Sequence, residues 1–285
     1  MISRTTRNLV PCFPILILLV LLVAPGCRKT QPASADFLYI EKYDQAYGTG
    51  TSRKYDLFLP EGRGRETKLI LLVHGGAWVA GDKWYNEAYA KSFAASGFAA
   101  VSMNYRLASD SVHCQAMLDD IDSMIVCIAG HSGEWGIGNG RVALFGYSAG
   151  GHLALLYSYS RDMGHNVAAV VSLAGPTDLQ DSLLWKSPGM YNDIGLMTGD
   201  TVPANWAWAS PVHFIGDDNP ATLLIHGTSD SVVPVSQSLR LSQLLRARDN
   251  GVTLLLLENE THGFSAAATK LFLGETKAFL DLHMK

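Results

Sequence analysis

The sequence predicts an α/β fold, a single domain with a mostly parallel central sheet and helices on both faces. Several short, almost wholly apolar runs, such as 69–73 and 167–173, are too short for a helix and too apolar for a strand that faces water. Such runs are typical of strands buried on both faces. They alternate with longer amphipathic segments, an order that favours parallel strands joined by helices. No internal repeat and no second block of distinct composition divides the 285 residues, so we expect one domain.

The boundaries of the elements follow from periodicity and from stop signals. Patterning typical of strands begins at Phe37, and the alternating run 55–59 ends at Pro60. We predict strands at 55–59, 69–73, 98–103, 142–145, 167–173, 221–225 and 252–257, and helices at 86–95, 115–129, 149–156, 236–247 and 266–282. Residues 179–210 contain three tryptophans and two prolines without a clean period. We expect this segment to be a small cap insertion that sets specificity.

The first 27 residues are predicted to be a signal peptide rather than part of the fold. Two arginines precede the apolar run 15–24, which is shorter than the ~20 residues that a membrane-spanning helix needs. The run ends in Pro-Gly-Cys, which resembles the processing site of bacterial lipoproteins, so Cys27 is the expected lipidation site. An ordinary signal peptide with a chance cysteine is the alternative. Residues 28–36 are a predicted linker and 37–285 the domain.

This leader implies that the protein is exported. With a lipid on Cys27 it is expected at a bacterial membrane, in the periplasm or at the cell surface, and without one it is secreted. The N-terminal lipid is then the only expected contact with a membrane. The sequence leaves the oligomeric state open.

The charge of the chain argues against one class of partner. The net charge is −4 with no block of basic residues, which argues against nucleic acid.

The two cysteines of the predicted domain are not expected to form a disulfide. Cys114 and Cys127 both fall in the predicted helix 115–129 or at its start. Thirteen residues of helix separate them by about 20 Å, beyond disulfide reach, so we expect two buried free thiols. They have no suitably spaced partners for zinc, and we expect neither a metal nor a cofactor.

The chemistry centres on the run Gly146-Tyr147-Ser148-Ala149-Gly150, which lies between an apolar strand and an apolar helix. A G-x-S-x-G turn in this context is a nucleophile elbow, in which small residues let the chain reverse tightly. The turn exposes the serine hydroxyl where the sheet ends. Ser148 is therefore the predicted nucleophile.

A base and an acid for Ser148 are expected on other loops beyond the carboxyl ends of strands. His262 follows the strand 252–257 on a loop able to reach back over the elbow, so it is the predicted base. Asp230 follows the strand 221–225 and would fix the tautomer of His262. Asp178 is the alternative acid, although a turn cap or a cap contact suits it better. His74 and His226, each directly before a glycine, are expected to order loops.

The tetrahedral intermediate of acyl transfer needs N–H donors aimed at its oxyanion. Ala149, directly after the nucleophile and at a helix N-terminus, supplies one predicted donor. Gly76 and Ala77 follow the buried strand 69–73 and are the other predicted donors, because their small size lets backbone amides approach a substrate.

These motifs together resemble the α/β-hydrolase superfamily, in particular hormone-sensitive-lipase-like esterases and small bacterial acetylxylan and feruloyl esterases of the BD-FAE type. The resemblance spans about residues 50–280 and rests on HGGAW at 74–78, GDK at 81–83, NYRL at 104–107, GYSAGGHLAL at 146–155, WASP at 208–211, HGTSD at 226–230 and THGF at 261–264. It places the family's nucleophile, acid and base on Ser148, Asp230 and His262. The sequence departs in having Ala77 where many such esterases have a third glycine, and in lacking the proline usual after NYRL.

The resemblance implies a serine carboxylesterase that needs no cofactor and acts through an acyl-enzyme. Export favours short acyl or feruloyl groups on extracellular carbohydrate, and the candidate substrate contacts are Trp78, Tyr147, Asp178 and Trp185. H-G-G-x-W also resembles the kynurenine formamidases, so an amide substrate is an alternative. A catalytically inactive hydrolase fold acting as a surface binding module is the alternative from another class.

Overall fold

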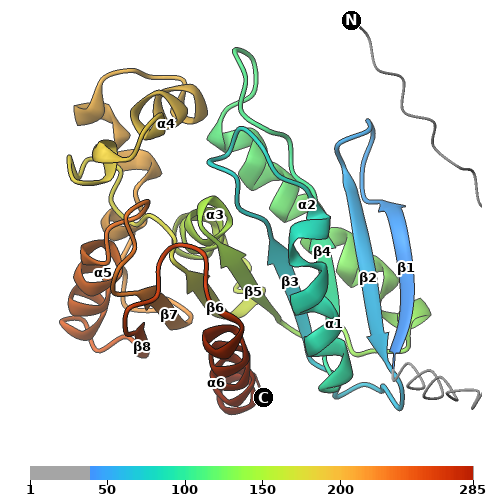
Figure 1. Ribbon diagram of the computed structural model, residues 1–285. Helices are drawn as coiled ribbons and strands as arrows, with labels where there is room; N and C mark the ends of the chain where they lie inside the picture. Colours follow the sequence, from blue (N-terminus) through green and yellow to red (C-terminus); the bar gives the residue numbers. More distant parts are fainter. Residues whose placement is uncertain (1–38, 285) are drawn as a thin grey trace, which may run out of the picture. The chain divides into compact units, whose positions relative to one another are not determined.

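The computed structural model describes residues 39–284, which form an eight-stranded sheet with helices on both faces (Figure 1). The strands are β1 Tyr39–Ala46, β2 Lys54–Pro60, β3 Leu69–Val73, β4 Ala99–Met103, β5 Val142–Tyr147, β6 Val167–Leu173, β7 Ala221–Gly227 and β8 Val252–Leu257. Their order in the sheet is β1-β2-β4-β3-β5-β6-β7-β8. The pairs β1·β2 and β2·β4 are antiparallel and every later pair is parallel. The predicted mostly parallel sheet is confirmed, whereas the predicted signal peptide, linker and lipidation site Cys27 lie outside the described residues.

Helices cover both faces of this sheet. They are α1 Glu87–Ala95, α2 Cys114–Trp135, α3 Ala149–Ser160, α4 Met190–Thr198, α5 Ser236–Arg246 and α6 Ala266–His283, with short 3₁₀ helices η1 Lys83–Asn86, η2 Leu184–Lys186, η3 Pro203–Ala209 and η4 Pro211–His213. One core joins the sheet to α2, α3 and α5, and the other joins it to α1 and α6. Figure 1 shows α1 and α6 in front of the strands.

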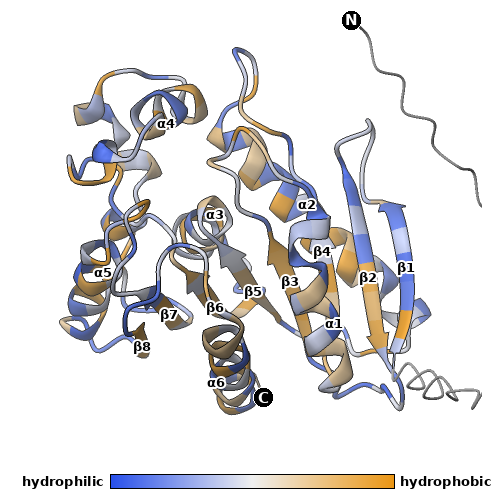
Figure 2. Cartoon of the chain, in the orientation of Figure 1, coloured by the Kyte–Doolittle hydropathy of each residue, from blue (hydrophilic) through white to orange (hydrophobic). Residues whose placement is uncertain are grey.

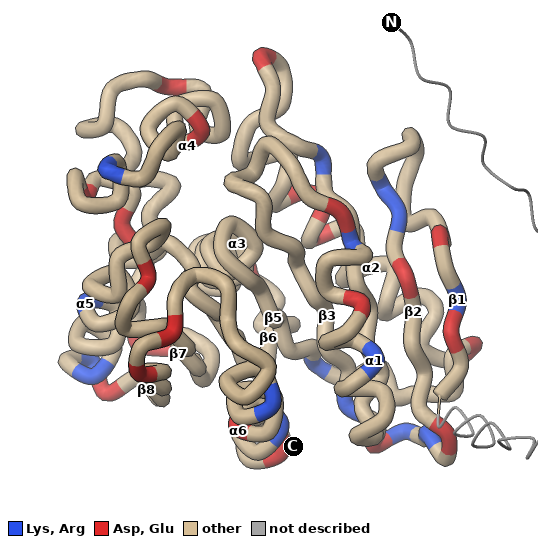
Figure 3. The backbone as a smooth tube through the Cα atoms, in the orientation of Figure 1, with Lys and Arg blue, Asp and Glu red and all other residues tan. Residues whose placement is uncertain are grey.

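The alternation of side chains along β3 shows why its sequence is apolar throughout. Leu69, Leu71 and Val73 belong to the core beneath α2 and α3, while Ile70 and Leu72 belong to the core beneath α1 and α6. All five are at most 4% exposed. Successive side chains of a strand point to opposite faces, so a strand covered on both sides must be apolar at every position. The strand β3 is accordingly hydrophobic along its length in Figure 2 and carries no charge in Figure 3.

The helix predicted at 115–129 is longer than expected. It runs to Trp135 and ends at Gly136, whose φ of 70° is the left-handed conformation typical of a helix C-terminus. Gly130 and Gly133 lie on its exposed side, while Ser132 and Trp135 continue its buried side. Packing of that side outweighs the low helix propensity of two glycines. Both cysteines on the helix are free, and Cys114 is buried as predicted, but Cys127 is only half-buried.

The segment 179–210 has more regular structure than its sequence indicates. It contains α4 and the 3₁₀ helices η2 and η3. A 3₁₀ helix, η1, precedes α1, whose bounds agree within one residue with the helix predicted at 86–95. Within residues 39–284, no helix combines the length and the apolar character that crossing a bilayer requires.

Candidate active site

Ser148 lies in a sharp turn between β5 and α3. Its backbone has φ 55° and ψ −122°, an unfavourable region for a residue with a side chain. Its N–H donates to Leu173 O at 2.8 Å, which holds the turn against the end of β6. A Cβ on Gly146 would lie 2.1 Å from Gly150 O, and one on Gly150 would lie 2.1 Å from Val73 O. Both glycines of the G-x-S-x-G turn are therefore required by close backbone packing.

The structure brings together the three residues predicted to act as nucleophile, base and acid. The Ser148 Oγ is 2.9 Å from His262 Nε2, and His262 Nδ1 is 2.7 Å from Asp230 Oδ2. The carboxylate accepts a hydrogen bond from Nδ1–H, which leaves the lone pair of Nε2 free to accept the serine proton. The imidazole is 16% exposed and the carboxylate is fully buried.

Asp230 is held as an anion by four donors. Its Oδ1 accepts from the N–H groups of Val232 at 2.8 Å and Val233 at 2.9 Å. Its Oδ2 faces His226 Nε2 at 3.3 Å in addition to His262. Burial alone would raise the pKa of this carboxyl, but the donated hydrogen bonds from the two histidines, with the charge of His262, outweigh burial and lower the pKa.

His226, which the sequence predicts to order a loop, also contacts the catalytic acid. Its ring is completely buried; Nδ1 lies 2.7 Å from Ser238 Oγ and Nε2 lies 2.9 Å from Val233 O. Nε2 faces only acceptors, so it carries the proton, and Nδ1 accepts from the serine hydroxyl. The ring does order the loop, as predicted, and its Nε2–H also faces Asp230. The sequence feature that could have indicated this contact is the position of His226 four residues before Asp230.

Tyr147, a predicted substrate contact, also supports the base. Its hydroxyl donates to His262 O at 2.7 Å, and its ring lies 5.3 Å from the imidazole at a tilt of 30°.

Gly227 lets the loop after β7 pack closely against the loop after β8, since a Cβ on Gly227 would lie 2.3 Å from Glu260 O. The loops after β7 and β8 are thereby fixed to each other and to the elbow.

The backbone after β3 forms a tight turn beside Ser148. Gly76, Ala77 and Trp78 have φ values of 120°, 50° and 64°, so three successive residues are left-handed. Gly76 O accepts from Val79 N at 3.1 Å and Ala80 N at 2.9 Å, which closes the turn. A Cβ on the preceding Gly75 would lie 3.2 Å from Ser148 Cβ, so the turn passes directly against the nucleophile.

Ala149 adds an amide from the other side of this site. It is the first residue of α3, where N–H groups have no partner within the helix. The predicted donors Gly76, Ala77 and Ala149 thus belong to two adjacent backbone segments next to the serine hydroxyl. This arrangement suits an oxyanion that develops on a carbonyl attacked by Ser148.

Trp78 was predicted to contact substrate, and the structure corrects this because the side chain is fully buried. Its indole Nε1–H donates to His152 Nδ1 at 3.1 Å, and His152 Nε2 donates to Ala209 O at 2.7 Å. Burial lowers the pKa of His152 to about 4, so the ring is neutral at physiological pH. Trp78 therefore anchors the left-handed turn to α3 and to the end of η3.

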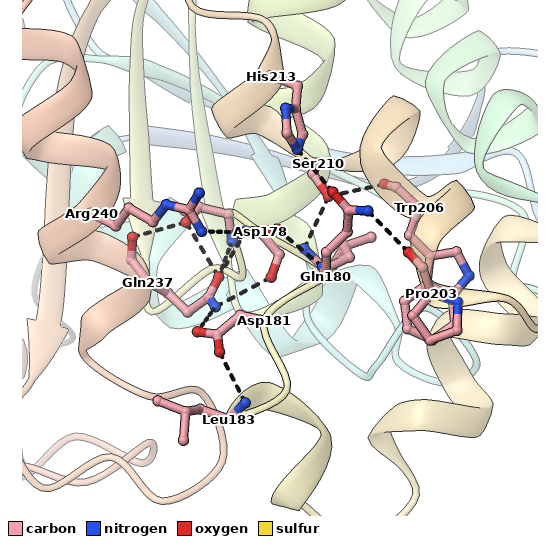
Figure 4. A network of polar contacts seen from close by, with 12 residues as sticks. Asp178, Gln180, Asp181, Leu183, Pro203, Trp206, Ser210, His213, Gln237 and Arg240 are labelled. Carbon is pink, nitrogen blue, oxygen red and sulfur yellow. Dashed lines mark hydrogen bonds and ion pairs between the residues drawn. The ribbon is translucent and has the colours of Figure 1, made fainter.

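Two further predicted substrate contacts also have structural partners. Asp178 is buried, accepts from Gln180 N at 3.0 Å and pairs with Arg240 (Figure 4). It makes no contact with His262, so the alternative acid is ruled out. Trp185 is half-buried; its indole N–H donates to Leu179 O at 2.9 Å and its ring packs 5.7 Å from that of Trp206.

The network in Figure 4 joins the base of the segment 179–210 to α5. Gln237, 1% exposed, accepts through Oε1 from the N–H groups of Thr177 and Asp178, each at 2.8 Å, and donates to Asp181 Oδ2 at 2.9 Å. The segment 179–210 is therefore fixed at its base. Among residues 39–284, no group of three or more His, Cys, Asp or Glu side chains is arranged to hold a metal ion.

Comparison with known sequences agrees with this geometry. The model of the BD-FAE family matches residues 55–245. The chain is 27% identical over 268 residues to esterase LipC of Mycobacterium tuberculosis, covering 84% of this chain and 64% of that protein. It is 25% identical over 250 residues to the probable isoprenylcysteine alpha-carbonyl methylesterase ICMEL1 of Oryza sativa, covering 80% of this chain and 56% of that protein. The chain thus spans less than two thirds of the length of these relatives.

Solved structures share the fold. A truncated carbohydrate esterase from gut microbiota superposes with a TM-score of 0.72 at 23% identity, covering 86% of this chain and 98% of the other. Esterase B of Lactobacillus rhamnosis, inhibited by a tributyrin phosphonate, gives a TM-score of 0.74 at 21% identity, covering 86% of each chain.

Proposed function

The chain belongs to the BD-FAE family, whose model matches residues 55–245, and on this premise we propose that it is a serine carboxylic ester hydrolase. The observation that carries the proposal is the unbroken line of hydrogen bonds from Ser148 Oγ through His262 to Asp230, at 2.9 and 2.7 Å. Relatives named as esterases support the same reaction class.

The proposed reaction has two steps. His262 Nε2 takes the Ser148 proton while Oγ attacks the ester carbonyl, and the amides of Gly76, Ala77 and Ala149 hold the oxyanion. The protonated imidazole, stabilised by Asp230, then gives its proton to the leaving alkoxide, and an acyl-enzyme remains. Water, deprotonated by the same nitrogen, attacks the acyl carbon, and the proton returns to Ser148 as the acid leaves.

Short acyl or feruloyl groups on carbohydrate are the proposed substrates. The fold neighbour named as a carbohydrate esterase and the predicted export of the chain support this class. A formamidase-like amide hydrolase is the second candidate, supported by the His-Gly-Gly-Ala-Trp run at 74–78. Parallel assays on acetyl, butyryl, feruloyl and N-formyl substrates separate the two, because an esterase prefers the first three.

Export and lipidation are part of the proposal. The predicted signal peptide ends at Cys27, so the full-length protein should fractionate with membranes and the Cys27→Ser variant should not. A soluble full-length protein with no change in the variant would contradict the lipid anchor without affecting the enzymatic proposal.

Hydrolysis of p-nitrophenyl acetate tests the reaction class. The wild-type protein should release p-nitrophenol, and Ser148→Ala should retain the fold but lose activity by at least about 10³-fold. Activity that survives in Ser148→Ala would overturn the assignment of the nucleophile. An inactive wild-type protein would favour a binding module that has kept the hydrolase fold.

A further inference from the structure

Two neighbouring aromatic residues on η1, Trp84 and Tyr85, stand open to solvent. Trp84 is 61% exposed and Tyr85 is 47% exposed, and their ring centroids are 4.6 Å apart at 89°. The other five tryptophans of the chain are buried or half-buried. Exposed aromatic pairs of this kind are informative, because large aromatic side chains lose free energy when they face water.

The backbone that carries the pair is rigid. Asp82 accepts from Trp84 N at 3.0 Å and from Asn104 Nδ2 at 2.8 Å, while Asn104 Oδ1 accepts from Lys83 N at 2.5 Å. Ser102 Oγ donates to Lys83 O at 2.7 Å.

The side chain of Lys83, which is 10% exposed, also holds this segment in place. Its Nζ pairs with Asp44 at 2.9 Å and with Asp56 at 3.0 Å. Burying a lysine costs free energy unless its charge is paired, and here the two carboxylates supply the pairing that keeps Lys83 in this position. A rigid surface loses little conformational entropy when it binds a ligand.

The segment just before the pair packs against the backbone next to the candidate active site. A Cβ on Gly81 would lie 2.3 Å from Gly75 O, and Gly75 packs directly against Ser148. The Tyr85 ring is 6.3 Å from the His74 ring, which stacks at 4.3 Å on Tyr105. A row of aromatic rings therefore leads from the oxyanion turn to Trp84. Since Trp84 is three residues from Gly81, it is at most about 11 Å further along the chain.

We propose that Trp84 and Tyr85 form a subsite for a pyranose ring of the carbohydrate part of the substrate, an inference that rests on the ester hydrolase function above. The faces of aromatic rings are electron-rich and attract the C–H bonds on the flat face of a sugar. The open position leaves the sugar hydroxyl groups in water, whereas an acyl chain needs an enclosed apolar pocket.

Charge around the pair favours the same ligand. Asp44, Asp82 and Glu87 lie near this turn; Asp44 pairs with Lys83 at 2.9 Å and Glu87 with Lys91 at 2.8 Å, so the two lysines offset part of the negative charge. Carboxylates accept hydrogen bonds from sugar hydroxyl groups and repel anionic ligands. An uncharged polyol fits both features.

Binding of oligosaccharides to the Ser148→Ala protein tests the subsite without catalysis. Isothermal titration with xylohexaose, cellohexaose and mannohexaose should detect binding of at least one, weakened about tenfold in the additional variants Trp84→Ala and Tyr85→Ala. Leu282→Ala, which truncates an equally exposed residue at 64% exposure, is the matched control and should bind as before. Absence of binding to all three oligosaccharides, or equal binding in the aromatic variants, would overturn the subsite.

Catalysis provides a second readout. On acetylated oligosaccharides, Trp84→Ala should raise KM with little change in kcat, and its loss in kcat/KM should be at least fivefold greater than on p-nitrophenyl acetate. An equal loss on both substrates would indicate a structural role and overturn the proposal. A wild-type protein without any esterase activity would instead refute the proposed function, so failure of the subsite and failure of the proposed function can be distinguished.

Discussion

Replacing Trp78 with phenylalanine should impair catalysis although the side chain never reaches the surface. The indole N–H donates to His152 Nδ1 at 3.1 Å and is fully buried. Phenylalanine keeps most of the packing but removes the donor. The left-handed turn at Ala77 and Trp78 then loses the hydrogen bond that holds it against α3.

The expected magnitudes follow from this single contact. A buried acceptor left without a donor costs about 1–3 kcal/mol, and the smaller ring adds about 1 kcal/mol for the space it leaves. Complete loss of one oxyanion donor lowers kcat by about 10²–10³-fold. A turn that is loosened but not removed should lower kcat by about tenfold. KM should change little, because negative charge on the oxygen develops only in the transition state.

Urea unfolding and steady-state kinetics on p-nitrophenyl acetate measure the two effects. Trp135→Phe is the matched control, since Trp135 is 2% exposed at the C-terminal end of α2 and packs 6.0 Å from the ring of Tyr55. It should lose stability without losing kcat. If Trp78→Phe is destabilised but keeps the same kcat as Trp135→Phe, the turn does not need this anchor and the reasoning is refuted.

Three other variants or conditions test separate parts of the structure. His226→Leu should lower kcat about tenfold, because Asp230 loses the donor at 3.3 Å; an unchanged kcat would show that His226 only fills space. Between pH 6.5 and 4 the unfolding free energy should fall by about 3 kcal/mol through His152, because the unfolded chain binds a proton there at the ordinary pKa whereas the folded pKa is about 4. Denaturant curves should show this slope flattened in His152→Gln, and an equal slope in both proteins would contradict it. Gly150→Ala should prevent folding, since its Cβ would lie 2.1 Å from a carbonyl oxygen, whereas Gly133→Ala has open space and should leave the circular dichroism melt unchanged or raised.

The sequence predicts the central strands and the nucleophile, base and acid positions because their signals are local. An all-apolar run such as that of β3 has few alternatives, and each residue of the triad lies within five residues of the end of a strand. The carboxyl ends of parallel strands meet at one edge of the sheet, so the sequence predicts that Ser148, Asp230 and His262 lie near each other.

Contacts between distant segments could not be predicted from local pattern. Whether Trp78 faces substrate or His152 depends on the relative position of the turn after β3 and α3, 74 residues apart. The same holds for Asp178, which pairs with Arg240 across 62 residues. The length of α2 depends on which side of the helix its two glycines face, and that is set by packing rather than by propensity.

Labelling with an organophosphonate tests the central claim, that Ser148 is a nucleophile activated by His262 and Asp230. Incubation with a fluorophosphonate followed by intact-protein mass spectrometry should give one adduct per chain, and peptide mapping should place it on Ser148. Asp230→Asn should slow the labelling by about 10³–10⁴-fold, because His262 then lacks the carboxylate that fixes its tautomer and stabilises its protonated form. No adduct on the folded wild-type protein, or an adduct at another residue, would contradict the account.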